Sequence, residues 1–407
     1  MKRYWLRNKK RILFFGAILI SLCTVFFLLM HTQLQASAQE NTGTSSADTA
    51  MNEMENSILE QLGELDLSGL EAYIGTLDGF MDENLAERLL KYIRGESVDY
   101  QEFGQAVLQL FFSNVQAILP SFACITAISL LSGLLSTLKS ETNGRASAEM
   151  IHLITYAGAL IPILTIVTKC FGVCLDCVSA MRAQMSLIFP LLLTMLAASG
   201  GSVSAAICKP AVGFFATTIV SIVQTVIFPV AMLIIAFSIA SNLTKELKIS
   251  KFTAFFKSIN KWIIGVCVSI FGIFFTVQGI TSATYDGVAR RAAKYAIGNG
   301  VPIVGGFLSG GFDLAVAGSV LIKNALGSMG IALLLFVLFE PMLLLIAVNV
   351  LLRLTSAITQ PFGDSRISNF LEETAGNLQY CTAGLLLTAF LYFLTIVLII
   401  CCTEAIL

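Results

Sequence analysis

Two acidic residues lie inside apolar stretches of this sequence, where a carboxylate can act only if protein or water covers it. Asp313 lies in residues 301–327, which also hold six glycines, and Glu340 lies in the apolar run 328–352. An ionisable group at membrane depth costs about 3 kcal/mol on insertion scales, so each acid indicates a polar path, an ion site or a subunit contact. We hypothesise that Asp313 and Glu340 face a shared hydrated interior. The alternative for Asp313 is a place near the membrane surface, held by a structural hydrogen bond.

Two glycine pairs precede Asp313 in the same segment. Gly305 and Gly306, and then Gly310 and Gly311, permit either close helix packing or unwound backbone. Lipid tolerates neither unless protein or water covers the exposed peptide groups, so the segment should face the protein interior or a subunit interface. Lys323, at the end of the segment, is expected to extend its ammonium group toward the membrane surface.

Other residue types offer little chemistry. Cys170, Cys174 and Cys177 have spacing that resembles a metal site, but a fourth ligand is missing because His152 lies a whole helix away. We expect most cysteines to be buried small hydrophobes, while a disulfide near residues 170–177, on the exported side, stays open. With only two histidines and no nucleophile or phosphate-loop pattern, the sequence predicts no enzyme, no metal and no cofactor.

The composition predicts a membrane protein. Hydrophobic residues make up 56% of the 407 residues and charged residues 13%, too few for a soluble surface. At about 20 residues per crossing, the chain after residue 105 can form roughly seven transmembrane helices. The predicted fold is therefore all-α and polytopic, with one or two broken or re-entrant Gly-rich segments. No basic stripe with interleaved aromatics is present, which argues against nucleic-acid binding.

The N-terminal part predicts export. Six basic residues precede an apolar stretch and the small residues Ala36-Ser37-Ala38, so residues 1–38 form either a cleaved signal peptide or a retained signal anchor. Residues 39–105 are acidic and contain short amphipathic helices after a polar lead. These helices either lie against the membrane face of the same protein or bind another exported protein. Residues 106–407 form the polytopic domain.

A basic segment sets the predicted orientation. Residues 242–261 hold five lysines against one acid, so this loop should be cytoplasmic and is a candidate partner-binding loop: Lys245, Lys248, Lys251, Lys257 and Lys261. An exported residue 105 then requires an odd number of crossings before the loop, whereas four apolar runs are present. We expect 187–207, which contains Pro190, to be re-entrant; alternatively 211–241 forms a tight hairpin.

Several stretches resemble the stage III sporulation protein AE family of endospore-forming bacteria. These are "GESVDYQEFGQAVLQLFFSNV", "PLLLTMLAASGG", "KWIIG", "QPFGDSRISNFLEETAGNL" and, most specific, the segment from Gln278 to Gly327. The resemblance runs from about residue 60 to the C-terminus. One departure is visible, because Gly310 stands where the family pattern has an acidic residue.

The resemblance implies a multi-pass protein of the mother-cell (outer forespore) membrane that acts in sporulation. It implies partners from the same complex, including a cytoplasmic ATPase and exported ring-forming proteins, and a role as export platform or pore component. Membrane lipid is a further expected contact, and a homo-oligomer is possible on this reasoning. The rival hypothesis is a stand-alone secondary transporter, with Asp313 and Glu340 as an intramembrane carboxylate site.

Overall fold

The computed structural model describes Ile58 and residues 67–74, 100–139, 145–243, 249, 251–274, 305–361 and 365–404. Within these residues every regular element is a helix and none is a strand, which confirms the all-α prediction. The predicted signal segment and residues 275–304, with most of the exported region, lie outside the described residues.

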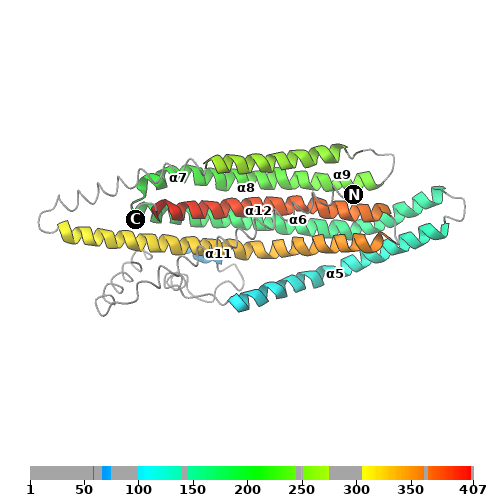
Figure 1. The fold of residues 1–407 in the computed structure, drawn as a ribbon, viewed down its shortest axis with the longest axis horizontal. Coiled ribbons are helices and arrows are strands. Elements are labelled where there is room, and N and C mark those ends of the chain that lie inside the picture. The colour runs from blue at the N-terminus through cyan, green and yellow to red at the C-terminus, as the bar shows by residue number, and fades with distance from the viewer. Residues whose placement is uncertain are drawn as a thin grey trace.

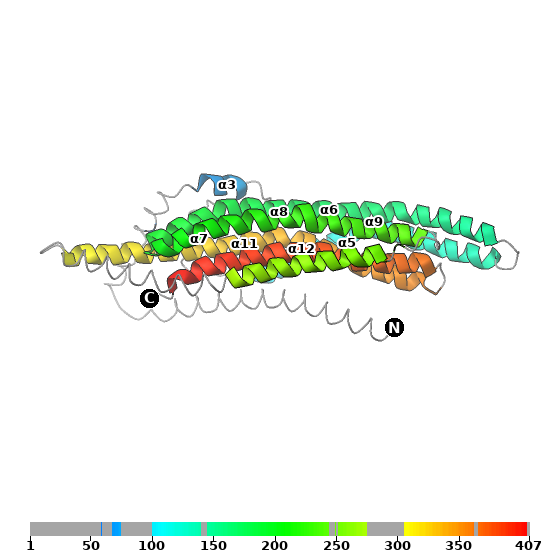
Figure 2. The same cartoon turned by 90° about the horizontal axis from the view of Figure 1, so that it is seen from above.

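The long helices form one elongated bundle (Figures 1 and 2). In chain order they are α5 (Tyr100–Lys139), α6 (Arg145–Ala198), the path from α7 (Ser202–Phe214) to α9 (Phe228–Leu243), a helix over Lys251–Phe274, α11 (Gly305–Thr359) and α12 (Ser365–Glu404). α6 packs against α5, α11 and α12, and α11 packs along α12. Helices consecutive in the chain run in opposite directions, as expected for short connections, so α6 and α12 run parallel to each other.

The helices are much longer than a membrane is thick. α6 has 54 residues and α11 has 55, so each is about 80 Å long at 1.5 Å per residue. The hydrocarbon core of a bilayer is only about 30 Å thick. Six helices in the described residues are long and apolar enough to cross a membrane, which agrees with a multi-pass protein. Each of the longest must nevertheless extend beyond the bilayer.

The continuity of α6 resolves the crossing count. Two of the four apolar runs, residues 151–169 and 187–207, are not separate crossings, because α6 joins the first to most of the second. The expected break does occur, at Ser199–Gly201, where Gly200 has φ of 92° and the chain turns back into α7. Among the described residues between 100 and 249, three long helical paths are therefore present, an odd number that satisfies the charge argument.

The second Gly-rich segment is not broken. α11 begins at Gly305 and continues through Gly310, Gly311 and Pro341 to Thr359, so of the two predicted possibilities for these glycine pairs, unwound backbone is excluded over the described residues. Glycine lowers helix propensity by only about 1 kcal/mol, and packing of the long helix against its neighbours outweighs that.

The path from α7 to α9 contains two π-helical segments, η1 (Phe215–Ile219) and η2 (Val223–Ile227), joined by α8 (Val220–Ile222). Thr217 and Thr225 donate their hydroxyls to the carbonyls of Gly213 and Ser221. Hydroxyl bonds of this kind satisfy carbonyl groups that an irregular membrane helix leaves free. Residues 211–241 are thus one bent helix, not the alternative hairpin.

Glycines on α11 and α12 allow these helices to pack closely against their neighbours. A Cβ on Gly327 would overlap Cδ1 of Ile400, so α12 touches the α11 backbone there. On the other side of α12, a Cβ on Gly384 would lie 2.6 Å from Cε1 of Phe228. Close approach at small residues is the main source of packing energy between membrane helices.

A short helix of the region predicted to be exported, α3 (Ser68–Ile74), lies against α6. Leu70 is buried, and Gln184 of α6 donates from Nε2 to the hydroxyl of Tyr73 at 3.2 Å. Burial raises the pKa of Tyr73, and the hydrogen bond from Gln184 lowers it in part. This part of the predicted exported region thus packs on its own protein, as the first of the two alternatives predicted.

Replacing Gly384 by Ala should destabilise the bundle. The new methyl group would clash with buried Phe228, and overpacking of this kind costs about 1–3 kcal/mol. Gly376→Ala, on the same helix with nothing within 4 Å, should leave stability unchanged or raise it by up to about 1 kcal/mol. Melting of the two detergent-purified variants checks the difference, and equal melting temperatures would contradict this packing.

Candidate functional site

The two predicted intramembrane acids do not lie together. Asp313 and Glu340 are both on α11, and the helix between them is continuous, so they are about 40 Å apart along its axis. The side chain of Glu340 is exposed on the outside of the bundle. The hypothesis of one shared interior is therefore wrong for a single molecule, because an unbroken helix cannot bring these residues together.

The predicted glycines lie in the first two turns of α11. Gly305, Gly306, Gly310 and Gly311 are helical, and the side chain of Asp313 lies outside the described residues. A pore-lining role for these five residues stays a prediction.

The basic segment is mostly helical. Lys251, Lys257 and Lys261 belong to the helix Lys251–Phe274, whereas Lys245 and Lys248 lie outside the described residues. The prediction that 242–261 is a loop is therefore wrong from Lys251 onward, and most of the residues between Leu243 and Lys251 lie outside the described residues. The helix folds back on α9, since Phe237 stacks on Phe256 with ring centroids 5.4 Å apart.

Several polar groups surround Glu373 of α12, at the end of the bundle where the helix Lys251–Phe274 packs on α9. The Oε2 of Glu373 accepts hydrogen bonds from Ser238 at 2.5 Å and from Asn242 at 3.1 Å, both on α9. The Glu373 carboxylate also interacts electrostatically with Lys257 and with Tyr156 of α6. The hydroxyl of Tyr156 donates a hydrogen bond to the carbonyl of Ile239. Lys257 is thus half-buried beside an acid of its own chain, which reduces its availability to a partner.

Lys323 does not extend to the membrane surface as predicted. Its side chain is fully buried, and Nζ donates to the carbonyl of Ile400 at 2.7 Å. Ile400 lies in the last turns of α12, where backbone carbonyls carry the negative end of the helix dipole. A buried cation is stable there because it meets that negative end, so the lysine joins α11 to the end of α12.

Truncating Lys323 should destabilise the contact between α11 and the end of α12. Lys323→Ala removes a charge-assisted hydrogen bond and buried packing, together worth about 2–4 kcal/mol. Lys209→Ala, at an exposed lysine of α7, should change stability by no more than about 0.5 kcal/mol. Thermal unfolding in one detergent compares them, and a Lys323→Ala variant as stable as the control would show that the contact is unimportant.

The three closely spaced cysteines lie on the buried face of α6. Cys170, Cys174 and Cys177 are free thiols, and their spacing of four and three residues places them on one helical side. They are not in an exported connection, because α6 runs straight through residues 170–186. The Sγ of Cys177 donates to the carbonyl of Val337, which fixes α6 against α11 at this level.

From Thr165 to Thr194 the opposite side of α6 is mainly polar, which sequence reasoning missed. Before Thr165 its exposed residues are apolar: Leu153, Ile154, Ile161 and Leu164. The exposed polar side chains form what we call the α6 polar face: Thr165, Thr168, Lys169, Asp176, Ser179, Arg182, Ser186 and Thr194. Gln224 of η2 adds to it by donating to the hydroxyl of Ser179 at 2.9 Å. Each charge facing lipid would cost about 3 kcal/mol, so this face requires water or protein where it crosses the bilayer.

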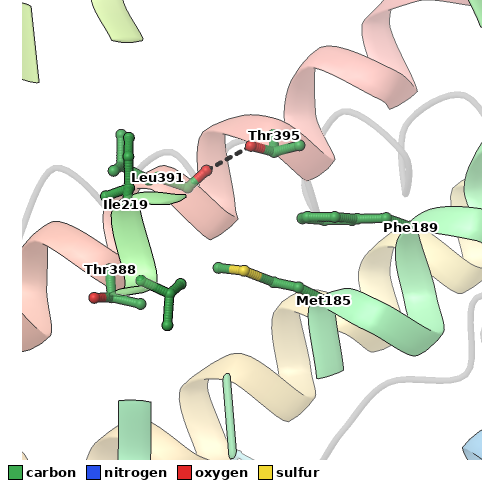
Figure 3. Close-up of a pocket in the computed structure, with 7 residues that line it drawn as sticks. Met185, Phe189, Ile219, Thr388, Leu391 and Thr395 are labelled. Atoms are coloured by element: carbon green, nitrogen blue, oxygen red, sulfur yellow. Dashed lines mark hydrogen bonds between the residues drawn. The ribbon is translucent and has the colours of Figure 1, made fainter. Parts of the chain in front are cut away.

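A small pocket lies on the inner side of the same helices. It is lined by residues of α6, η1, α8 and α12 (Figure 3): Met185, Phe189, Ile219, Val220, Thr388, Leu391 and Thr395. The hydroxyl of Thr395 donates to the carbonyl of Leu391 and so does not point a free donor at a ligand. Its enclosed volume is about 10 Å³, no more than about one water molecule needs and far below the roughly 300–1,000 Å³ of small-molecule sites.

Comparison with known proteins places these features in a family. Residues 84–403 match the family model described as stage III sporulation protein AE. The chain is also 25% identical over 371 residues to the Bacillus subtilis (strain 168) protein named stage III sporulation protein AE, covering 91% of this chain and 89% of that protein. No solved structure matches the chain.

Proposed function

Because the chain belongs to the stage III sporulation protein AE family, we propose that it is the membrane subunit of a transenvelope complex required for endospore development. In this proposal it lies in the mother-cell (outer forespore) membrane and acts as an export platform or pore component. It has no enzymatic activity of its own. Its partners are a cytoplasmic ATPase and exported ring-forming proteins.

The observation that carries the proposal is the length of the bundle. Helices of about 80 Å extend beyond a hydrocarbon core of about 30 Å, so they offer protein surface outside the membrane. At one end lies the basic stretch before Lys251, whose charge suits an acidic surface. The predicted exported region contacts the bundle through α3, which packs on α6. A subunit that connects two compartments needs contacts on both sides.

The rival, a stand-alone transporter, has less support. Its proposed carboxylate site required Asp313 and Glu340 at one depth, and they are about 40 Å apart on α11. The pocket around Met185 is small and mainly apolar in its lining.

Co-purification tests the proposed function. The tagged full chain is extracted from sporulating cells in mild detergent, and the proteins that accompany it are identified. We expect the sporulation ATPase and the ring-forming proteins, in amounts that a tagged unrelated membrane protein does not recover. A chain that is recovered alone, under conditions in which cross-linking before extraction also captures no partner, would contradict the proposal.

Reversing part of the basic segment tests the cytoplasmic contact. Lys245→Glu, Lys248→Glu and Lys251→Glu together should weaken recovery of the ATPase about tenfold at low salt, since exposed charge pairs contribute about 0.2–1 kcal/mol each. The loss should shrink as salt is raised, because salt screens exposed charges. A matched triple change to Gln should have a smaller effect. Unchanged recovery in both would show that the lysines only orient the chain.

A further inference from the structure

The carboxylate of Glu373 joins α12 to α9 at the end of the bundle that carries the basic helix Lys251–Phe274. Its Oε2 accepts hydrogen bonds from Ser238 at 2.5 Å and from Asn242 at 3.1 Å, which lie one turn apart on α9. Ser238 is buried, whereas the side chain of Glu373 is exposed. The carboxylate therefore lies at the edge of the bundle, where it meets other groups from the solvent side.

An aromatic stack brings Lys257 to this carboxylate. Phe256 stacks on Phe237 of α9 with ring centroids 5.4 Å apart and an angle of 16° between the rings. Lys257 follows Phe256, and Ser238 follows Phe237, so the stack places Lys257 at the level of the hydrogen bond from Ser238 to Glu373. Lys257 is half-buried there and interacts electrostatically with Glu373.

The negative charge of Glu373 is matched by Lys257. The hydroxyl of Ser238 and the amide of Asn242 are neutral donors, and a neutral acceptor such as the side-chain oxygen of glutamine would also satisfy them. Of the described groups that interact with Glu373, Lys257 alone is a cation. The charge of Glu373, as distinct from its hydrogen bonds, thus acts on a lysine of the basic segment.

This contact changes the surface that the basic helix presents. Lys257 and Lys261 are one turn apart, so they share one side of the helix. Lys261 is exposed, while Lys257 is held toward the bundle. Turned outward, Lys257 would add a second positive charge beside Lys261, and two adjacent lysines suit a surface that carries several carboxylates.

We propose that Glu373 competes with the acidic partner of the basic segment. It occupies Lys257 in the unbound chain, and a carboxylate of the partner replaces it when the partner binds. The inference rests on the proposed cytoplasmic contact and names how that contact is regulated. The partner class is an acidic protein surface, since only carboxylates offer Lys257 the interaction that it already makes with Glu373.

The exposure of Glu373 makes the competition reversible. An ion pair that solvent reaches changes an equilibrium by about 1.4- to 5-fold. It lowers the affinity of the partner by a similar factor, because the partner binds only those chains in which Lys257 is released. A surface that offers several carboxylates overcomes a competitor of this strength, whereas a deeply buried pair would resist it.

Amine acylation measures the contact without any partner. The detergent-purified full chain is treated with sulfosuccinimidyl acetate, and mass spectrometry gives the acetylation rate of Lys257 relative to the exposed Lys251. Glu373→Gln keeps an acceptor for the donors on α9 but removes the charge, so Lys257 should react about two- to fivefold faster. Glu372→Gln, at the adjacent exposed acid, is the matched control and should leave the ratio unchanged.

Retention on immobilised poly-L-glutamate measures the competition. At low salt, the bound-to-free ratio of Glu373→Gln should exceed that of Glu372→Gln about two- to fivefold. This difference should disappear when both changes are made in a Lys257→Gln chain, because the lysine that is released is then absent. Lys257→Gln alone should reduce retention less than Lys251→Gln does, since Glu373 already occupies Lys257.

The two experiments separate the steps of the proposal. Unchanged acetylation of Lys257 in Glu373→Gln would overturn the contact, and faster acetylation without stronger retention would overturn the competition. Gel filtration checks that Glu373→Gln is folded. If it is not, the comparison of Lys257→Gln with Lys251→Gln decides, and an equal loss of retention in both overturns the proposal. Neither experiment contains the ATPase, so failure here is distinguishable from failure of the proposed function, which co-purification reports.

Discussion

The apolar face of α6 is the contact on which the other long helices depend. Cys170, Cys174, Cys177 and the residues that follow them on the same side are buried against α11, α12 and the bent helix before α9. Membrane helices have little hydrophobic driving force between them in lipid, so shape complementarity must supply it. Free cysteines suit this role because they are small and polarisable, and they let helices approach as the glycines of α11 and α12 do.

The fold class could be predicted from the sequence, and the lengths of the helices could not. Apolar runs identified the membrane segments, but Lys169, Asp176 and Arg182 made residues 170–186 look like a connection between two crossings. A signal for the continuous helix was present. The cysteines recur at intervals of four and three on one side, while Thr165, Thr168, Asp176 and Ser179 share the other. Following that period across the charges would have predicted both α6 and its polar face.

The candidate site was predicted in kind but not in place. Sequence reasoning placed Lys323 at the membrane surface, which was wrong because its partner, the carbonyl of Ile400 on α12, is distant in sequence. A single sequence does not reveal such a pairing, because the register between α11 and α12 is set by contacts such as that between Gly327 and Ile400. For the same reason the role of Glu373 was not foreseen, since its hydrogen-bond donors lie more than a hundred residues earlier on α9.

The hydrogen bond between Lys323 and Ile400 determines where a domain fused after α12 would lie. It keeps the last turns of α12 at the end of the bundle where α6 turns into α7, away from Leu243, the last residue of α9, and from Lys251 (Figure 1). A reporter domain fused after α12 would consequently be carried on the opposite side of the membrane from the basic stretch between these two residues. If the basic stretch is cytoplasmic, as its lysines predict, a reporter that matures only in the cytoplasm is unsuited to a fusion after α12, and an enzyme that works outside the cytoplasm is suited to it.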